Sequence, residues 1–283
     1  MTETPAPPAL AYVIAGSEAT GGAGIQADLK TFQALGAYGF GTLTCIVSFD
    51  PANDWGHRFI PVDPQVIADQ IEAAVACHAP DVVKIGMLGT PATIDTVADS
   101  LAQHPWRHVV LDPVLICKGQ EPGAALDTDT ALTERILPLA TVVTPNVFEA
   151  RTLAGMERID SVDDLVEASQ RIHALGPRYV IAKGGVELDG PDAVDVLYDG
   201  ERTTVVSTPK IGQERVSGAG CTFAAAVTAE LAKGAEITDA VRVAKQVVTQ
   251  GILDRLGSHA PFDAVRLTGA ENLAAGLVQV RTS

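Results

Sequence analysis

The stretch LAYVIAGSEATGGAGIQADLKTFQAL, residues 10–35, decides the fold of this chain. Its first six residues, 10–15, are apolar and predict a buried strand. A glycine-rich turn follows. Apolar side chains then recur at helical spacing and predict a helix over 21–35: Ile25, Leu29, Phe32 and Leu35. A strand that passes through a tight turn into an amphipathic helix is a building unit of parallel α/β sheets.

The same alternation continues along the rest of the chain. It predicts further strands over 42–49, 81–85, 108–111, 140–143 and 178–182. It predicts helices over 64–76, 91–101, 161–175, 220–232 and 235–253, and another that begins at Val147. Two late strands, 193–198 and 203–207, flank Asp199-Gly200, a strong hairpin signal. Strands that alternate with helices predict an α/β fold with a mainly parallel central sheet and helices on both faces.

Two of the predicted helices carry start signals. Asp63 precedes Pro64, so the aspartate can cap the helix while proline takes its first position. Ser161 is followed three residues later by Asp164, which is close to a capping box. The pattern after Gly257 is irregular and predicts no element.

Composition excludes several classes of protein. Of the 283 residues 47% are hydrophobic, which excludes a mostly disordered chain. The 20 basic and 35 acidic residues give a net charge of −15, which argues against a nucleic-acid or anionic-membrane binder. No apolar run approaches the ~20 residues needed to span a membrane. We expect a loose tail over 1–9, a single domain over 10–283 and a cytoplasmic location.

The four cysteines give no metal or disulfide signal. They lie far apart in the chain, and no CxxC motif occurs. A zinc site is therefore not expected, and neither is a disulfide framework in a chain of this size.

Chemically useful residues follow the predicted strands. Ligands in open α/β sheets bind beyond the carboxyl ends of the strands. Those positions carry Gly16-Ser17, Asp112-Pro113, Asn146, Lys183-Gly184-Gly185 and the run Ser217-Gly218-Ala219-Gly220-Cys221.

Two glycine-rich clusters could approach a ligand closely. The first, residues 15–30, could hold phosphate, although it lacks the Gly-Lys-Ser/Thr ending of a Walker sequence; a flexible turn is the alternative. In the second, small residues run directly into an apolar helix, whose free N–H groups would form an anion hole. Cys221 would lie in the first turn of this helix, where a thiol pKa tends to fall. A buried core thiol is the alternative.

Acidic residues and a lysine complete the set. Asp112 follows a strand directly, and Glu149 lies three residues after Asn146. Such oxygen ligands suit Mg²⁺ carried on a nucleotide, whereas a turn and a solvated helix face are the alternatives. Lys183 could contact a phosphate or simply end its strand. Together the clusters point to phosphoryl transfer by a kinase without a Walker sequence.

Five segments resemble one family. They are residues 15–30 (AGSEATGGAGIQADLK), Asp112-Pro-Val, Thr144-Pro-Asn-Val-Phe-Glu149, Lys183-Gly-Gly185 and Gly218-Ala-Gly-Cys-Thr-Phe223. In order and spacing they are similar to the hydroxymethylpyrimidine kinase and pyridoxal kinase branch of the ribokinase-like family, over about residues 11–253. The resemblance implies a three-layer α/β/α fold, ATP and Mg²⁺ as cofactors, a small-molecule substrate and a homodimer.

Within this branch the sequence favours a pyridoxal kinase. Phe49 replaces a glutamine usual in hydroxymethylpyrimidine kinases, and residues 50–57 resemble the dual-cysteine bacterial pyridoxal kinases. Cys117 matches the second cysteine of that group. The alternatives are a hydroxymethylpyrimidine/phosphomethylpyrimidine kinase of thiamin synthesis, a bifunctional enzyme or, more remotely, a non-catalytic vitamer-binding protein. One departure is Ser217, where relatives usually have histidine.

The resemblance also implies roles. Cys221 would be the base for the substrate's 5′-hydroxymethyl group, beside the N–H groups of Gly218, Ala219 and Gly220. Cys117 would capture the aldehyde of pyridoxal as a hemithioacetal. Asp112 and Glu149 would hold Mg²⁺, and the nucleotide would lie near Asn146, Lys183 and Ser217. The vitamer pocket would comprise Gly16, Ser17, Ala23, Phe49, His57 and Met87.

Overall fold

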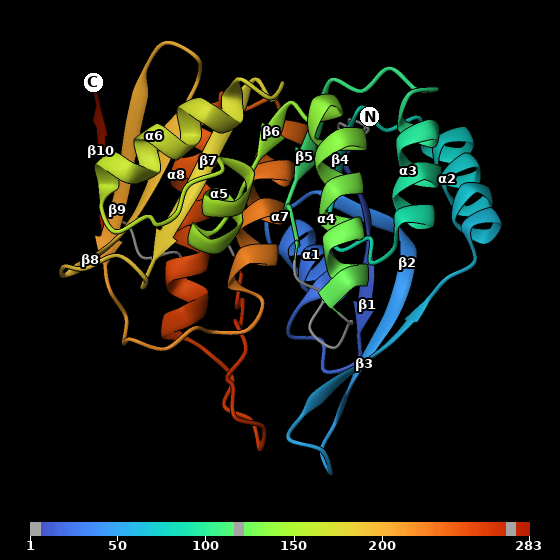
Figure 1. Ribbon diagram of the computed structural model, residues 1–283, viewed down its shortest axis with the longest axis horizontal. Helices are drawn as coiled ribbons and strands as arrows, with labels where there is room; N and C mark the ends of the chain where they lie inside the picture. The colour runs from blue at the N-terminus through green and yellow to red at the C-terminus, as the bar shows by residue number, and fades with distance from the viewer. Residues whose placement is uncertain (1–6, 116–121, 270–275) are drawn as a thin grey trace, which may run out of the picture.

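A computed structural model describes residues 7–115, 122–269 and 276–283. The described strands form one sheet in the order β10-β9-β8-β7-β6-β5-β4-β1-β2-β3 (Figure 1). Their bounds are β1 Leu10–Glu18, β2 Tyr38–Asp50, β3 Gly56–Pro61, β4 Val82–Ile85, β5 His108–Leu111, β6 Val142–Val143, β7 Tyr179–Gly185, β8 Asp192–Tyr198, β9 Thr203–Pro209 and β10 Gln279–Thr282. The six central strands from β7 to β2 pair in parallel, while β3, β8, β9 and β10 pair antiparallel.

Helices cover both faces of this sheet. Their bounds are α1 Gly24–Ala34, α2 Pro64–His78, α3 Pro91–Leu101, α4 Pro122–Arg135, α5 Val147–Leu153, α6 Val162–His173, α7 Ala219–Ala232 and α8 Ile237–Leu253, with a 3₁₀ turn at Leu137–Leu139. The helices from α2 to α6 lie on one face, and α1, α7 and α8 lie on the other (Figure 1). The predicted three-layer α/β/α fold is therefore confirmed.

The hydrophobic cores on both faces of the sheet explain why the sequences of the central strands are continuous apolar runs. In β1, Tyr12 and Ile14 pack into the core beneath α2 to α6. Ala11, Val13 and Ala15 pack into the core beneath α1, α7 and α8. Because both faces are covered, alternate side chains are all buried and no polar alternation remains.

Both predicted helix caps are confirmed. The Asp63 carboxylate accepts a hydrogen bond from the Gln65 amide at 2.9 Å, with Pro64 in the first helical position. Ser161 and Asp164 form a complete capping box at the start of α6. Local sequence is enough here because a cap joins residues only two or three positions apart.

Two edge strands and one helix were not predicted. The strand β3 is largely exposed, and β10 is exposed at all four residues, so neither shows an apolar pattern. The irregular pattern after Gly257 predicted no element, and the structure adds β10 there, whose backbone pairs with β9. The helix α4 follows the Asp112-Pro113 strand end. No helix in the described ranges is long and apolar enough to cross a membrane.

Candidate active site

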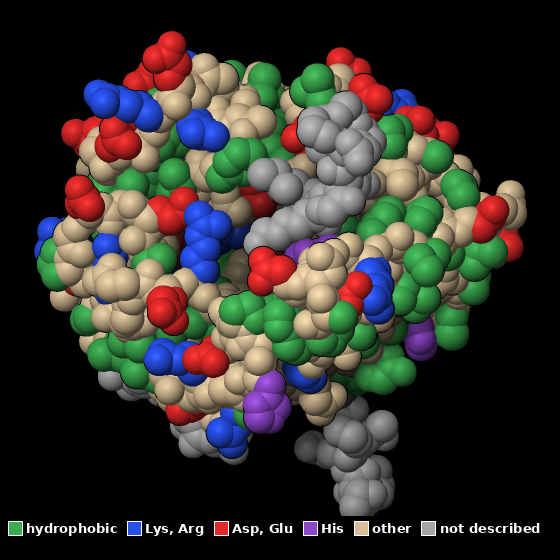
Figure 2. Space-filling model, turned by 60° about the horizontal axis from the view of Figure 1, so that its bottom comes forward, with side chains coloured by type: hydrophobic (Ala, Val, Ile, Leu, Met, Phe, Trp, Pro, Cys, Tyr) green, Lys and Arg blue, Asp and Glu red, His purple; other side chains and the backbone are tan. Residues whose placement is uncertain are grey.

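Most of the residues predicted at the strand ends meet at one cavity of about 350 Å³. Asp112, Asn146, Glu149 and Lys183 line one side, and the first turn of α7, from Gly218 to Cys221, lines another. The remaining wall comes from β7 to β9, from α8 and from loop residues, including those between β9 and α7. Figure 2 looks onto this end of the molecule, where a hollow opens between charged side chains. The parallel strands thus collect residues that are distant in sequence at one edge of the sheet.

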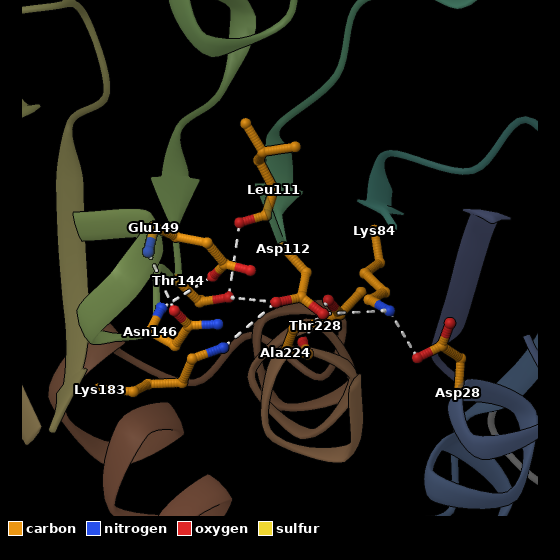
Figure 3. A network of polar contacts seen from close by, with 10 residues as sticks. All are labelled: Asp28, Lys84, Leu111, Asp112, Thr144, Asn146, Glu149, Lys183, Ala224 and Thr228. Carbon is orange, nitrogen blue, oxygen red and sulfur yellow. Dashed lines mark hydrogen bonds and ion pairs between the residues drawn. The ribbon is translucent and has the colours of Figure 1, made fainter. Parts of the chain in front are cut away.

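Asp112 lies between two lysines, the buried Lys84 and the partly buried Lys183 (Figure 3). The Lys183 ammonium donates to Asp112 Oδ1 at 3.2 Å, and Lys84 Nζ lies 4.0 Å from Oδ2. The Thr144 hydroxyl is 3.4 Å from Oδ1. Burial alone would raise the pKa of Asp112, but Lys183 and Lys84 together hold it below its usual range. Asp112 is therefore a fixed negative charge at the cavity.

The lysine of β4 extends this network into the core. Lys84 Nζ donates to Asp28 Oδ1 at 2.7 Å, and both side chains are fully buried. Burial works to lower the pKa of Lys84, but Asp28, Cys221 and Asp112 outweigh it, so the pKa is raised and the ammonium stays charged. Asp28 and Lys84 were not predicted to belong to the site. The available signal was a single charge inside the apolar run Val82-Val-Lys-Ile85.

Asn146 and Glu149 cap the helix that carries them. Asn146 Oδ1 accepts from the Glu149 amide at 3.0 Å, and Glu149 Oε2 accepts from the Asn146 amide at 2.8 Å. This capping box holds both side chains rigidly at the cavity wall. Burial raises the pKa of Glu149 to about 8. Asp112 adds to this increase, and Lys183 acts to lower the pKa.

We expect the raised pKa of Glu149 to make stability fall with pH. The folded protein holds this proton more tightly than the unfolded chain, so stability is lost as pH rises from the ordinary value of 4.5 through about 8. Glu149→Gln keeps an acceptor for the cap and removes the titration. Urea unfolding at several pH values should therefore give a flatter profile for Glu149→Gln. Parallel profiles for the two proteins would contradict the expectation.

The start of α7 is shaped as an anion site. Gly218 has a left-handed φ of 81°, and a Cβ there would collide with the Gly22 carbonyl oxygen, so only glycine fits. No described side chain caps the helix. The Ala219 amide makes only a long 3.3 Å contact with the Val216 carbonyl. The first-turn N–H groups can therefore receive an anion.

Cys221 lies in this first turn and lines the cavity. The expectation of a lowered thiol pKa is wrong: burial raises it to about 11. Lys84 acts in the opposite direction, while Asp112 and Asp28 add to the increase. Proximity to a helix N-terminus does not compensate for the loss of solvent and for two nearby carboxylates.

The residues predicted for the vitamer pocket lie at the same edge of the sheet but do not line the 350 Å³ cavity. Phe49 and His57 face each other across β2 and β3, with ring centroids 4.7 Å apart. The Ser17 hydroxyl accepts from Gln26 at 2.7 Å, and the Met87 carbonyl accepts from Thr44 at 2.7 Å. Two further members lie at neighbouring strand and helix ends: Gly16 in β1, packed against Cys45, and Ala23 at the N-cap of α1.

The structure does not place Cys117, Ser217 or Cys77 at the cavity. Cys117 lies outside the described residues. Ser217 does not line the cavity, and its backbone instead bonds to residues 263 and 265. Cys77, in α2, is an exposed free cysteine.

Glu18 organises the first glycine-rich loop and was not predicted to do so. Its buried carboxylate accepts from the Thr20 amide at 2.6 Å and the Thr20 hydroxyl at 2.7 Å. It also accepts from the amides of Gly22 at 3.2 Å and Ala23 at 3.3 Å. A carboxylate that satisfies several loop donors fixes the loop's shape.

The acidic residues fit a nucleotide-borne Mg²⁺ rather than a closed protein site. Within the described ranges no three His, Cys, Asp or Glu side chains form a metal-binding group. Asp112 and Glu149 would supply two ligands, so phosphate oxygens and water would complete the shell. Burial, helped by Asp112, raises the pKa of Glu149, and a bound cation would act in the opposite direction and favour its carboxylate.

The fold and site together define a class of protein: an α/β kinase in which a glycine-rich helix start faces carboxylates and a lysine. The chain belongs to the phosphomethylpyrimidine kinase family, whose sequence pattern matches residues 18–263. Pyridoxine kinase of Bacillus subtilis is 48% identical over 242 residues, 86% of this chain and 89% of that protein. The hydroxymethylpyrimidine/phosphomethylpyrimidine kinase of the same organism is 39% identical over 251 residues, 87% and 90% of the two chains.

Solved structures agree. An ADP complex of Bacillus subtilis pyridoxal kinase has a TM-score of 0.89 at 43% identity and covers 94% of this chain and 100% of that one. Staphylococcus aureus pyridoxal kinase with AMP-PCP and pyridoxal has a TM-score of 0.88 at 37% identity, covering 98% and 99%. The predicted family is confirmed, and the chain is a kinase that phosphorylates an alcohol group.

Proposed function

We propose that this protein uses ATP to phosphorylate the 5′-hydroxymethyl group of pyridoxal, and also that of pyridoxine and pyridoxamine. The observation that carries the proposal is the 48% identity to a pyridoxine kinase, against 39% to the hydroxymethylpyrimidine kinase of the same organism. The cavity supports it because its size and its lysine, carboxylates and helix start suit a nucleotide's phosphates.

In this mechanism Cys221 removes the proton of the substrate hydroxyl. The hydroxyl oxygen forms a bond to the γ-phosphorus as the bond to the ADP oxygen breaks. The first-turn amides of α7, including those of Gly218, Ala219 and Gly220, stabilise charge on the transferred group. Lys183 and Asn146 orient the phosphates. Asp112 and Glu149 would hold Mg²⁺, which neutralises phosphate charge when bound.

Cys117 is proposed, from sequence, to add to the C4′ aldehyde of pyridoxal and form a hemithioacetal. Pyridoxine has an alcohol at this position and cannot react. Cys117→Ala should therefore reduce kcat/KM for pyridoxal by roughly tenfold or more, since a covalent tether is lost. Steady-state assays with both vitamers, and with Cys77→Ala as control, check this. Equal losses for pyridoxal and pyridoxine would reject covalent capture.

The proposed function is tested by parallel assays with ATP and Mg²⁺, read by mass spectrometry. Pyridoxal, pyridoxine, pyridoxamine and hydroxymethylpyrimidine are each offered to the purified protein. Dominant turnover of the B6 vitamers supports the proposal. Preference for hydroxymethylpyrimidine with a second phosphorylation would assign the protein to thiamin synthesis, and comparable turnover of both would make it bifunctional. No turnover of any would favour a non-catalytic binding protein.

A further inference from the structure

The segment over 258–265, here called the strap, returns from the end of α8 to the active-site edge of the sheet. Its backbone runs beside Ser217, directly before the anion site. The Ser217 amide donates to the Asp263 carbonyl at 2.8 Å, and the Val265 amide donates to the Ser217 carbonyl at 3.0 Å. In Figure 1 the chain after α8 and the β2–β3 hairpin both extend from this edge. The strap is thus hydrogen-bonded to the residue that introduces α7.

Phe262 joins the strap to the β2–β3 hairpin. Its ring centroid lies 5.1 Å from that of Phe49 and 6.2 Å from that of Trp55. Phe49 in turn contacts His57 at 4.7 Å. These rings come from two segments at opposite ends of the chain. Phe49 and His57 are proposed vitamer-pocket residues, so Phe262 packs directly on one residue of that proposed pocket.

The strap also contacts the first glycine-rich loop. A Cβ placed on Gly22 would lie 3.0 Å from the Ala264 Cβ and 3.6 Å from the Ser217 hydroxyl oxygen. Gly22 therefore packs closely on both the strap and Ser217. The hairpin, the glycine-rich loop and the start of α7 all meet the strap.

The strap has its own internal supports. The Ser258 hydroxyl donates to the Phe262 carbonyl at 2.7 Å and accepts from the Ala260 amide at 3.0 Å. From outside the strap, Arg255 Nε lies 3.0 Å from Asp263 Oδ2. These contacts define the shape of the segment before any ligand binds.

We propose that the strap sets the position of the vitamer relative to the anion site, and that Phe262 is its positioning residue. The substrate hydroxyl must meet the phosphoryl group held at α7 within a narrow geometry. Phe262 fixes the hairpin, while residues 263–265 fix Ser217. The proposal rests on the proposed function, because it takes Phe49 and His57 as parts of the vitamer pocket.

The kinetic test compares Phe262→Ala with His259→Ala, an exposed residue of the same strap. Phe262→Ala should raise KM for pyridoxine and lower kcat/KM by roughly 10- to 100-fold, as expected for a misplaced substrate. KM for ATP should change less than about twofold, because Phe262 does not line the cavity that holds Asn146 and Lys183. Phe262→Tyr should restore pyridoxine kinetics. If Phe262→Ala does not fold, Phe262→Leu takes its place.

A second readout is independent of turnover. The chain has two tryptophans, and the partly buried Trp106 stacks on the core residue Tyr12, with ring centroids 6.0 Å apart. Trp106→Phe therefore leaves Trp55 as the only tryptophan fluorophore. Adding Phe262→Ala should shift Trp55 emission to longer wavelength without ligand, because the indole loses a packed neighbour. Adding pyridoxine should change the emission of the Trp106→Phe protein, which retains Phe262. It should change the emission much less when Phe262→Ala is also present.

The outcomes separate the two proposals. If the unmodified protein phosphorylates the vitamers, and Phe262→Ala matches His259→Ala in both kinetics and Trp55 emission, the strap proposal alone is overturned. Equal increases in KM for ATP and for pyridoxine would also overturn it, since they indicate general loosening. Absence of vitamer turnover in the unmodified protein would reject the proposed function, and an unchanged Trp55 emission would then reject the strap as well.

Discussion

Replacing Cys221 with alanine is expected to lower kcat for vitamer phosphorylation by about 10²- to 10⁴-fold, the range typical for loss of a general base. Nucleotide binding should persist because Lys183, Asp112 and the helix amides remain in place. Steady-state kinetics and ADP titration measure the two effects. Cys77→Ala, at an exposed cysteine, is the matched control and should retain normal turnover.

The pH profile separates a base from a merely structural thiol. Burial raises the pKa of Cys221 to about 11, so the reactive thiolate is scarce at neutral pH and becomes more abundant as pH rises. Below this pKa, log kcat/KM should therefore increase with pH with a slope of about one. Cys221→Asp carries a carboxylate that ionises near pH ~4 in its unperturbed state, so its profile should be flatter. A flat profile for the unmodified protein, or near-normal rates for Cys221→Ala, would reject the base assignment.

Replacing Lys84 with methionine is expected to lower the free energy of unfolding by about 3–5 kcal/mol, the usual cost of breaking a buried ion pair. Asp28 would lose its 2.7 Å partner while remaining fully buried, and one Asp28 oxygen already has no hydrogen-bond partner. Urea denaturation at neutral pH measures the change. A loss below about 1 kcal/mol, the size typical of a surface pair, would contradict it.

The double variant Lys84→Met/Asp28→Asn separates stability from activity. It removes both charges, so most of the lost stability should return. Turnover should stay low, because Asp112 Oδ2 has lost the ammonium that lies 4.0 Å away. A loss of roughly 10- to 100-fold is expected for an outer-shell partner of a metal ligand. Full recovery of turnover would show that Lys84 serves folding alone.

The candidate site could be located from sequence but its electrostatics could not. Asp112, Asn146, Glu149 and Lys183 follow strands, and parallel strands end at one edge, so their convergence was predictable. The state of Cys221 was not. A helix start favours a thiolate, yet burial and the carboxylates of Asp112 and Asp28 prevail and raise its pKa. Those carboxylates lie far from Cys221 in sequence, so no local pattern reports them.

Sequence alone determined the alternation of the central strands with most of their helices, the helix caps at Asp63 and Ser161, and the family. Each of these depends on residues a few positions apart or on motifs that occur as continuous runs. Only the tertiary structure decided which charges pair, which groups lose water and what the strap contacts. Lys84 and Asp28 are 56 positions apart, and Phe262 meets Phe49 from the opposite end of the chain. Burial and pairing arise from packing between distant segments, and this packing sets the pKa values and the geometry of the site.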